Sequence, residues 1–218
     1  WKIVKKDVLE AIFYFFNSKY LPRFFTATFL VLIPKVDTPS GFDKFWPISL
    51  CSVFYKICSK IIVNRLTGLL SRMISWEQGA FVPGRSIFEN ITITQEMIHS
   101  INKKAHGGNI MIKLDMAKAY DRVDWLFLLE VLRCFGFSSN FCDLIRTCIS
   151  TPWYSIMMNG TIKGFFKAGR GLRQGDPFSP YLFIILQEIF SRLIKQSVEA
   201  KKFGQFSQAR GMPRISHL

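Results

Sequence analysis

Acidic residues are scarce in this sequence. The 218 residues include 15 Asp and Glu against 29 Lys and Arg, which gives a formal net charge of +14. A folded domain this basic usually binds a polyanion, either nucleic acid or an anionic membrane surface. A basic surface that only keeps the protein soluble is the alternative. Between Lys163 and Arg214 ten basic residues accompany only three acidic ones, and this uneven distribution favours a binding face.

The sequence also lacks the patterns of metal centres, disulfide frameworks and membrane spans. Its five cysteines form no CxxC pair and its three histidines stand far apart. A zinc site or disulfide framework is therefore not expected, and the cysteines are interpreted as reduced, largely buried thiols. The longest apolar stretches, such as Phe24 to Ile33, are too short to cross a bilayer. No signal peptide is visible, and no membrane partner is expected.

Residue periodicity predicts a mixture of helices and strands. The predicted helices cover residues 1–20, about 52–70, about 87–101, the segment from an N-cap at Asp124 to a terminating glycine at Gly136, and the segment after Ser179. The predicted strands cover residues 24–33, 109–115, 154–158 and 161–166. The last two strands flank Asn159-Gly160, which is a strong hairpin signal. Residues 35–44 are polar and predict a loop.

The segment Asn109–Asp115 is the first candidate for chemistry. Every second residue from Ile110 to Leu114 is apolar, which predicts a strand with one buried face and Asp115 on the other face at its end. A carboxylate in that position can hold Mg²⁺ together with phosphate oxygens. Phosphoryl transfer with two metal ions needs further ligands. The alternative is that Asp115 only ends the strand while Asp121 and Asp124 cap the following helix.

The segment GLRQGDPFSP, residues 171–180, places Arg173 and Gln174 between two glycines. Glycines suit a loop whose backbone comes close to a ligand. Arg170 and Arg173 could contact phosphate, and Gln174 could form a hydrogen bond with a base or a sugar. The alternative is an ordinary loop that leads into a helix.

A second candidate loop, QGAFVPGRS, precedes the helix predicted near residue 87. Its Gly84-Arg85 pair offers a guanidinium group next to the free backbone amides of a helix N-terminus. Together these groups make a natural phosphate site. A solvated surface charge is the more common role of a single Arg in a loop, and it stays open as the alternative.

Taken together, eight segments resemble the reverse transcriptases of LINE-type (non-LTR) retrotransposons, most closely the copies in plant genomes. They follow the order of that family over essentially the whole chain: FLVLIPKV, FWPISLCSVFYKI, NRL, EQGAFVPGRSI, IKLDMAKAYDRVDW, MNG, GLRQGDPFSPYLF and ISHL. The resemblance implies an α+β fold that forms the fingers and an incomplete palm of a right-handed polymerase. It implies three regions: a helical lead-in (1–24), fingers (25–105) and a partial palm (106–218).

The resemblance also implies roles for single residues. Asp115 is the implied catalytic metal-binding carboxylate, with the Met116 carbonyl beside it. The implied nucleotide-binding positions are Lys35, Arg85, Tyr120, Gln174 and Gly175. Among them, Tyr120 corresponds to the aromatic residue that blocks a ribose 2′-hydroxyl. The implied nucleic-acid contacts are Arg170 and Arg173. The implied cofactor is Mg²⁺, with Mn²⁺ as a substitute, and the implied partners are an RNA template, a DNA primer and dNTPs. The cellular location is left open, with the nucleus compatible with the family.

The sequence departs from the family pattern in two ways. Trp46 stands where the family usually has Arg before Pro-Ile-Ser-Leu, so a phosphate contact there is lost, which suggests a decayed genomic copy. The sequence also ends at ISHL, before the aromatic-Ala-Asp-Asp hairpin that carries the remaining metal ligands in the family. We therefore expect a fragment of an RNA-directed DNA polymerase that is inactive as given. The alternative is a non-catalytic, basic nucleic-acid-binding remnant.

Overall fold

The chain divides into two compact units in a computed structural model, which describes residues 1–103, 108–202, 206 and 215–218. Unit 1 comprises Trp1–Arg65 and Lys118–Leu182, and unit 2 comprises Leu66–Ala117 and Phe183–Leu218. Two long helices, α3 (Val53–Met73) and α7 (Ser179–Glu199), contribute residues to both units. The boundary expected between residues 105 and 106, and much of the basic stretch beyond residue 202, lie outside the described residues.

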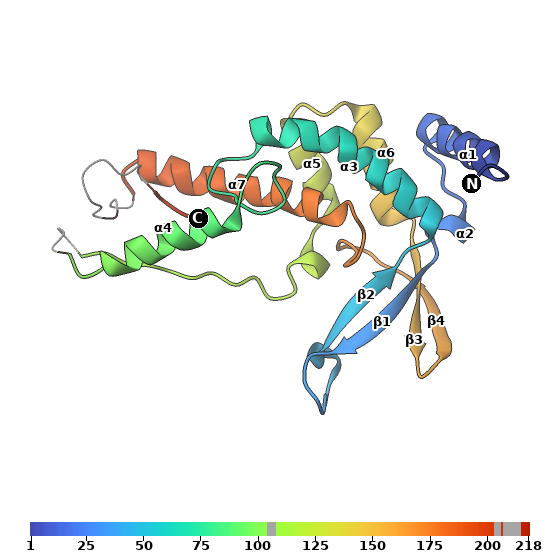
Figure 1. Ribbon diagram of the computed structural model, residues 1–218, viewed down its shortest axis with the longest axis horizontal. Helices are drawn as coiled ribbons and strands as arrows, with labels where there is room; N and C mark the ends of the chain where they lie inside the picture. The colour runs from blue at the N-terminus through green and yellow to red at the C-terminus, as the bar shows by residue number, and fades with distance from the viewer. Residues whose placement is uncertain (104–107, 203–205, 207–214) are drawn as a thin grey trace. The chain divides into compact units, whose positions relative to one another are not determined.

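A four-stranded sheet organises unit 1. Its strands are β1 (Thr28–Pro34), β2 (Phe45–Leu50), β3 (Trp153–Met158) and β4 (Thr161–Lys167), in the order β2-β1-β3-β4. The β1–β2 and β3–β4 pairs are antiparallel, whereas β1 and β3 run parallel. Figure 1 shows the two hairpins side by side, with their tips apart. Asn159 and Gly160 both have positive φ, 48° and 75°, as a two-residue type I′ turn requires. The predicted hairpin is confirmed.

The first predicted strand begins later than expected. Residues 24–26 belong to the short helix α2 (Arg23–Thr26), and β1 starts only at Thr28. Strand β2 was not expected, because Pro47 interrupts its sequence pattern. Pro47 lies in an edge strand, where a missing backbone N–H is tolerated. The 35–44 loop between β1 and β2 contains one short 3-10 helix, η1 (Phe42–Lys44).

Four further helical elements build the rest of unit 1: α1 (Lys5–Ser18), η2 (Tyr120–Arg122), α5 (Trp125–Cys134) and α6 (Ser139–Ser150). The Asp124 carboxylate accepts a hydrogen bond from Phe127 N at 2.8 Å, and Gly136 has φ 86° beyond the other end of α5. Both predicted boundaries of this helix are confirmed. The fully buried side chains of unit 1 include Tyr55, Leu128, Leu132, Ile145, Phe178 and Leu182. Each aliphatic member stabilises the fold by roughly 1.5–3 kcal/mol.

In unit 2, buried carboxylates attach the turn after α3 to α7. Glu188 accepts hydrogen bonds from the backbone N–H and the hydroxyl of Ser75, and Arg192 donates to it at 2.9 Å. Lys195 Nζ lies 2.8 Å from Glu77 Oε2. The remaining helix, α4 (Ile87–His99), begins where the Ser86 hydroxyl accepts from Phe88 N.

The strand predicted at residues 109–115 is wrong. Asn109–Met116 has no regular secondary structure, and the side chains of Ile110, Ile112 and Leu114 are exposed. An alternating pattern makes a strand only where a neighbouring strand accepts and donates the backbone hydrogen bonds. Within the described part of the chain, no strand pairs with this segment. Asp115 is exposed, but it does not end a strand.

Four of the five cysteines, Cys51, Cys58, Cys142 and Cys148, are buried, as expected, while Cys134 is exposed. Burial raises the pKa of the Cys58 and Cys148 thiols to about 12. These two thiols therefore remain protonated at neutral pH. Among the described residues, no helix has both the length and the apolar character needed to span a bilayer.

Candidate functional site

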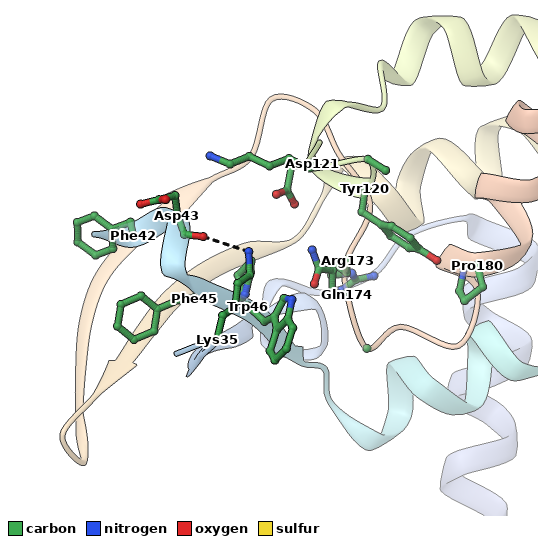
Figure 2. Close-up of a pocket in the computed structure, with 14 residues that line it drawn as sticks. Lys35, Phe42, Asp43, Phe45, Trp46, Tyr120, Asp121, Arg173, Gln174 and Pro180 are labelled. Atoms are coloured by element: carbon green, nitrogen blue, oxygen red, sulfur yellow. Dashed lines mark hydrogen bonds between the residues drawn. The ribbon is translucent and has the colours of Figure 1, made fainter. Parts of the chain in front are cut away.

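A cavity of about 580 Å³ opens in unit 1, where three segments distant in the sequence meet. The first segment runs from the end of β1 to the start of β2, the second is residues 118–121, and the third is the loop that follows β4. Figure 2 shows side chains from all three segments around the cavity. Five residues with predicted ligand contacts line it together: Lys35, Tyr120, Arg173, Gln174 and Gly175.

Backbone hydrogen bonds hold the third segment in place. Ser49 N on the outer edge of β2 donates to Gln174 O at 2.7 Å. Leu172 N donates to Tyr120 O at 2.9 Å. The loop is therefore bonded to β2 on one side and to η2 on the other. This double attachment brings Tyr120 and Gln174 to the same cavity.

Two glycines make this close approach possible. Gly175 has φ +103°, and a Cβ atom there would lie 2.9 Å from Ser49 O. Gly171 has φ +94°, and a Cβ atom there would lie 3.1 Å from Asp121 O. Positive φ is strained for residues with a side chain, and the neighbouring backbone leaves no space for one. Both positions therefore require glycine.

Arg173 lies in the interior beneath the loop. Its Nη2 donates to Asp176 Oδ2 at 3.2 Å and to the Cys148 carbonyl at 3.1 Å, and its Cζ lies 3.8 Å from the centre of the Tyr55 ring. The side chains of Arg173 and Asp176 are only 4% and 3% exposed. The nucleic-acid contact predicted for Arg173 stays a prediction, and its side chain is enclosed in this structure.

Tyr55 and Asp176 complete this buried network. The Tyr55 hydroxyl donates to Asp176 Oδ2 at 2.7 Å, and Phe178 N donates to Asp176 Oδ1 at 3.0 Å. Burial raises the pKa of Tyr55 well above its usual value, so its hydroxyl keeps the proton that it donates. An ion pair out of water is stable only when its remaining polar atoms are hydrogen-bonded, and this pair meets that condition. The network fixes the path of the loop behind Gln174 and Gly175.

Lys35 and Trp46 form the wall of the cavity that comes from the β1–β2 hairpin. Lys35 Nζ donates to the Asp43 carbonyl at 3.1 Å and lies 5.9 Å from the centre of the Trp46 ring. The Trp46 side chain is 50% exposed, so one flat indole face and one cation are available to a ligand. Sequence reasoning had noted Trp46 only as a departure from the family pattern. Its position in the cavity could have been expected, because its segment FWPISL follows the segment that contains Lys35 along the chain.

On the opposite wall, Tyr120 points its ring toward the Pro180 side of the cavity (Figure 2). Burial raises the pKa of Tyr120, so its phenol is neutral at physiological pH. Lys118 and Asp121 line the same wall, and neither was predicted. The Asp43 carboxylate across the cavity has a pKa lowered by a hydrogen bond from Lys44, so it is charged at neutral pH.

Arg85 in unit 2 bonds to backbone carbonyl groups, and its predicted nucleotide contact stays a prediction. Its guanidinium donates to the carbonyl oxygens of Ile74 at 2.8 Å, Gln78 at 3.1 Å and Ser75. These carbonyls follow the end of α3, where helical carbonyl groups lack partners within the helix. The bonds occupy the fork of donors that a phosphate would need.

Asp115 and Met116 also belong to unit 2. The Asp115 side chain is exposed, and Met116 Sδ accepts a hydrogen bond from Gln187 Nε2 at 3.1 Å. Among the described residues, no three His, Cys, Asp or Glu side chains lie together as a metal-binding group. Asp115 thus fits one ligand position of a metal site, and the described residues do not complete it. The approach of Asp115 to the cavity stays a prediction. Arg170 is exposed at the start of the loop, where its predicted contact remains open to test.

Comparison with known sequences gives a consistent result. The family profile described as "Reverse transcriptase (RNA-dependent DNA polymerase)" matches residues 33–207. An uncharacterised 149 kDa protein of transposon TX1 from Xenopus laevis is 29% identical over 196 residues, which is 90% of this chain and 15% of that protein. The Pol polyprotein of the Nasonia vitripennis R2 element is 31% identical over 175 residues, 79% of this chain and 17% of that protein. The chain thus spans about a sixth of the length of these curated relatives.

Among solved structures, the chain is similar to apo telomerase from Candida tropicalis truncated from its C-terminal domain. The TM-score is 0.51 at 15% sequence identity, and the match covers 90% of this chain and 46% of the telomerase chain. At this identity the similarity supports the fold alone. The α+β class expected from the sequence is confirmed.

Proposed function

Because this chain belongs to the reverse transcriptase (RNA-dependent DNA polymerase) family, we propose that its cavity is the nucleotide site of a retrotransposon polymerase. The reaction would transfer a nucleotide from a dNTP to a DNA primer paired with an RNA template. The observation that carries the proposal is the meeting of Lys35, Tyr120, Gln174 and Gly175 around one cavity of about 580 Å³. In this proposal, residues 1–24, 25–105 and 106–218 are a helical lead-in, the fingers and part of the palm.

Each wall of the cavity offers one kind of contact to a dNTP. Lys35 supplies a positive charge for the triphosphate, since an ammonium group binds phosphate as a point charge. The backbone at Gln174 and Gly175 approaches the sugar and base, because the close packing of Gly175 on β2 holds the loop in this position. The Tyr120 ring faces the sugar and excludes a 2′-hydroxyl. Trp46 brings no cation to its position, so Lys35 and Lys118 are the exposed cations that line the cavity.

We further propose Asp115 as one ligand of the divalent ion that reverse transcriptases generally use, with Mg²⁺ as the ion and Mn²⁺ as a substitute. Such an ion neutralises phosphate charge and organises the reacting oxygens when it is bound. The described residues supply only this carboxylate with the Met116 carbonyl beside it, so no catalytic step is assigned to them.

A second candidate function is a non-catalytic, nucleic-acid-binding remnant. It is favoured by Trp46 at the position where the family usually has Arg. Nucleotide binding separates the two functions. Binding of dTTP that weakens in Lys35→Ala supports the polymerase site. RNA binding without dTTP binding supports the remnant.

Replacing Lys35 by alanine is expected to weaken dNTP binding by about tenfold to hundredfold, the loss of one charge-assisted phosphate contact. Isothermal titration of the chain with dTTP in the absence of nucleic acid measures this change. Lys60→Ala is the matched control, because Lys60 is exposed on α3 and does not line the cavity. Equal affinity in Lys35→Ala and the unmodified chain would contradict the proposed site.

Tyr120→Ala is expected to raise the affinity for ribonucleotides relative to deoxyribonucleotides by about tenfold, the usual scale of discrimination by pocket size. The smaller side chain leaves space for the 2′-hydroxyl, whereas Tyr120→Phe keeps the ring and should keep the preference. Competition between UTP and dTTP for the chain measures this ratio. A ratio that is the same in all three proteins would show that Tyr120 only packs in the wall.

A further inference from the structure

The segment Leu144–Gly175 contains five basic residues and no acidic residue. Two of the five have acidic partners: Arg146 lies 3.3 Å from Asp143, and Arg173 pairs with Asp176. The other three, Lys163, Lys167 and Arg170, have no acidic partner in the described part of the chain. Two of these unpaired cations stand on β4, whose seven residues are all exposed.

An aromatic stack accompanies these cations on the β3–β4 hairpin. The Phe165 ring stacks on the Trp153 ring with centroids 4.8 Å apart and planes 17° apart. Arg23 Cζ lies 4.7 Å from the centre of the same Trp153 ring. Phe165 is nevertheless 53% exposed. Lys167 pairs directly with Trp153 across the two strands, so it lies on the same face as the stack.

We propose that the β3–β4 hairpin docks single-stranded RNA, with a base stacked on Phe165 and a backbone phosphate at Lys167, because Lys163 pairs with Ile156 and lies on the other face of the hairpin. Exposed aromatic rings beside unpaired cations are the usual way in which proteins hold single strands without reading their sequence. Double-stranded RNA fits this surface less well, because its bases are already stacked and proteins recognise it mainly by shape. The inference rests on the proposed function in taking the RNA to be the template.

The position of the hairpin in the sheet fits a template that continues past the cavity. The outer edge of β2 borders the cavity, and β4 is the opposite edge of the same four-stranded sheet. Three strand spacings separate the two edges, which is about 14 Å. Phosphates follow one another at about 3.4 Å along one strand of a helical nucleic acid. A template base in the cavity and a base on Phe165 would thus be only a few nucleotides apart.

Lysines on an edge strand also have a simpler explanation, because they discourage the strand from pairing with another molecule. That role needs charge, but it does not need the exposed Phe165. A surface that binds RNA depends on both the charge and the exposed ring, and the two contributions can be distinguished by how binding varies with salt concentration. Loss of stacking weakens binding at every salt concentration, whereas loss of phosphate contacts lowers the dependence of binding on salt.

The test is fluorescence anisotropy of the full chain with a labelled single-stranded RNA of about 10 nucleotides, within the range of known single-strand binding sites. No nucleotide or divalent ion is added. Phe165→Ala is expected to weaken binding about tenfold. Lys167→Glu is expected to weaken it as well and to lower the slope of log affinity against log salt by about 0.7. Phe165→Leu keeps apolar volume against Trp153 but has no ring, so it should bind like Phe165→Ala.

Matched controls come from α1. Phe13→Ala removes another exposed ring, and Lys5→Glu makes the same change in net charge. Both controls should stay within about twofold of the unmodified chain, the usual scale of surface substitutions. Thermal unfolding confirms that each variant is folded.

Three results would overturn the proposal: no RNA binding by the unmodified chain, unchanged binding by both Phe165 variants, or equal weakening by the α1 controls. Tighter binding of single-stranded DNA of the same sequence would overturn the assignment to an RNA template. Failure of the nucleotide site is seen separately, in the dTTP titration of Lys35→Ala, which contains no RNA.

Discussion

Arg173→Ala is expected to lower the free energy of unfolding by about 3–5 kcal/mol, the cost of removing one partner from a buried ion pair. The change leaves the Asp176 carboxylate, 3% exposed, without its positive partner. It also opens a void against the Tyr55 ring, which the guanidinium covers. Urea unfolding followed by circular dichroism measures the change.

Arg170→Ala is the matched control, because Arg170 lies in the same loop but is exposed. Its effect should stay within about 0.5 kcal/mol, as for most surface substitutions. The double change Arg173→Met with Asp176→Leu should cost less than the two single changes added together, since it leaves no charge unpaired. A loss below about 1 kcal/mol in Arg173→Ala, set against the same principle, would mean that the network contributes little to stability.

Gly175→Ala is expected to destabilise unit 1 by roughly 1–3 kcal/mol through backbone strain alone, and to abolish measurable dNTP binding. The new Cβ atom would lie 2.9 Å from Ser49 O at φ +103°. The loop must therefore move away from β2, and the hydrogen bond from Ser49 N to Gln174 O breaks. Calorimetric titration with dTTP and urea unfolding measure the two effects.

Gly169→Ala controls for the loss of a glycine in the same loop. No atom lies within 4 Å of a Cβ built at residue 169, and its φ is not in the positive range. This variant should bind dTTP normally and should be equally stable or slightly more stable. If Gly175→Ala bound dTTP as well as Gly169→Ala, the close packing of the loop on β2 would not matter for the site.

Elements that depend on neighbouring residues were predictable from the sequence. The Asp124 cap, the glycine after α5 and the Asn159-Gly160 turn each act within a few residues of the chain. Strand β2 was not predicted, because Pro47 interrupts its sequence pattern. Its extended conformation depends on hydrogen bonds with β1, which the local sequence does not show. The pattern of residues 109–115 misled for the same reason, since the described residues supply no neighbouring strand. Helix α6 was missed, although Cys142, Ile145 and Ile149 repeat at helical spacing.

The candidate site was predictable as a set of residues but not as a set of roles. Resemblance to the family identified Lys35, Tyr120, Gln174 and Gly175, and these residues line one cavity. It also suggested ligand contacts for Arg173, which pairs with Asp176 in the structure. Asp176 in turn accepts a hydrogen bond from Tyr55, which lies 121 residues away in the sequence. Motif spacing does not report which side of a loop faces the interior. For that reason the sequence suggested that the charge of Arg173 was free to bind phosphate, whereas the structure pairs it with Asp176.

The parallel pairing of β1 with β3 has a consequence for how the protein is made. Thr28 pairs with Tyr154, so β1 leaves the ribosome long before its second neighbour exists. At about 5–20 residues per second, the strand waits roughly 6 to 25 seconds with one edge unsatisfied. Only the β1–β2 hairpin can form in that interval, because its partners are close in sequence. The cavity, which needs the loop after β4, is therefore among the last features to mature. Until then the open edge of β1 is a place where the nascent chain can pair with other chains.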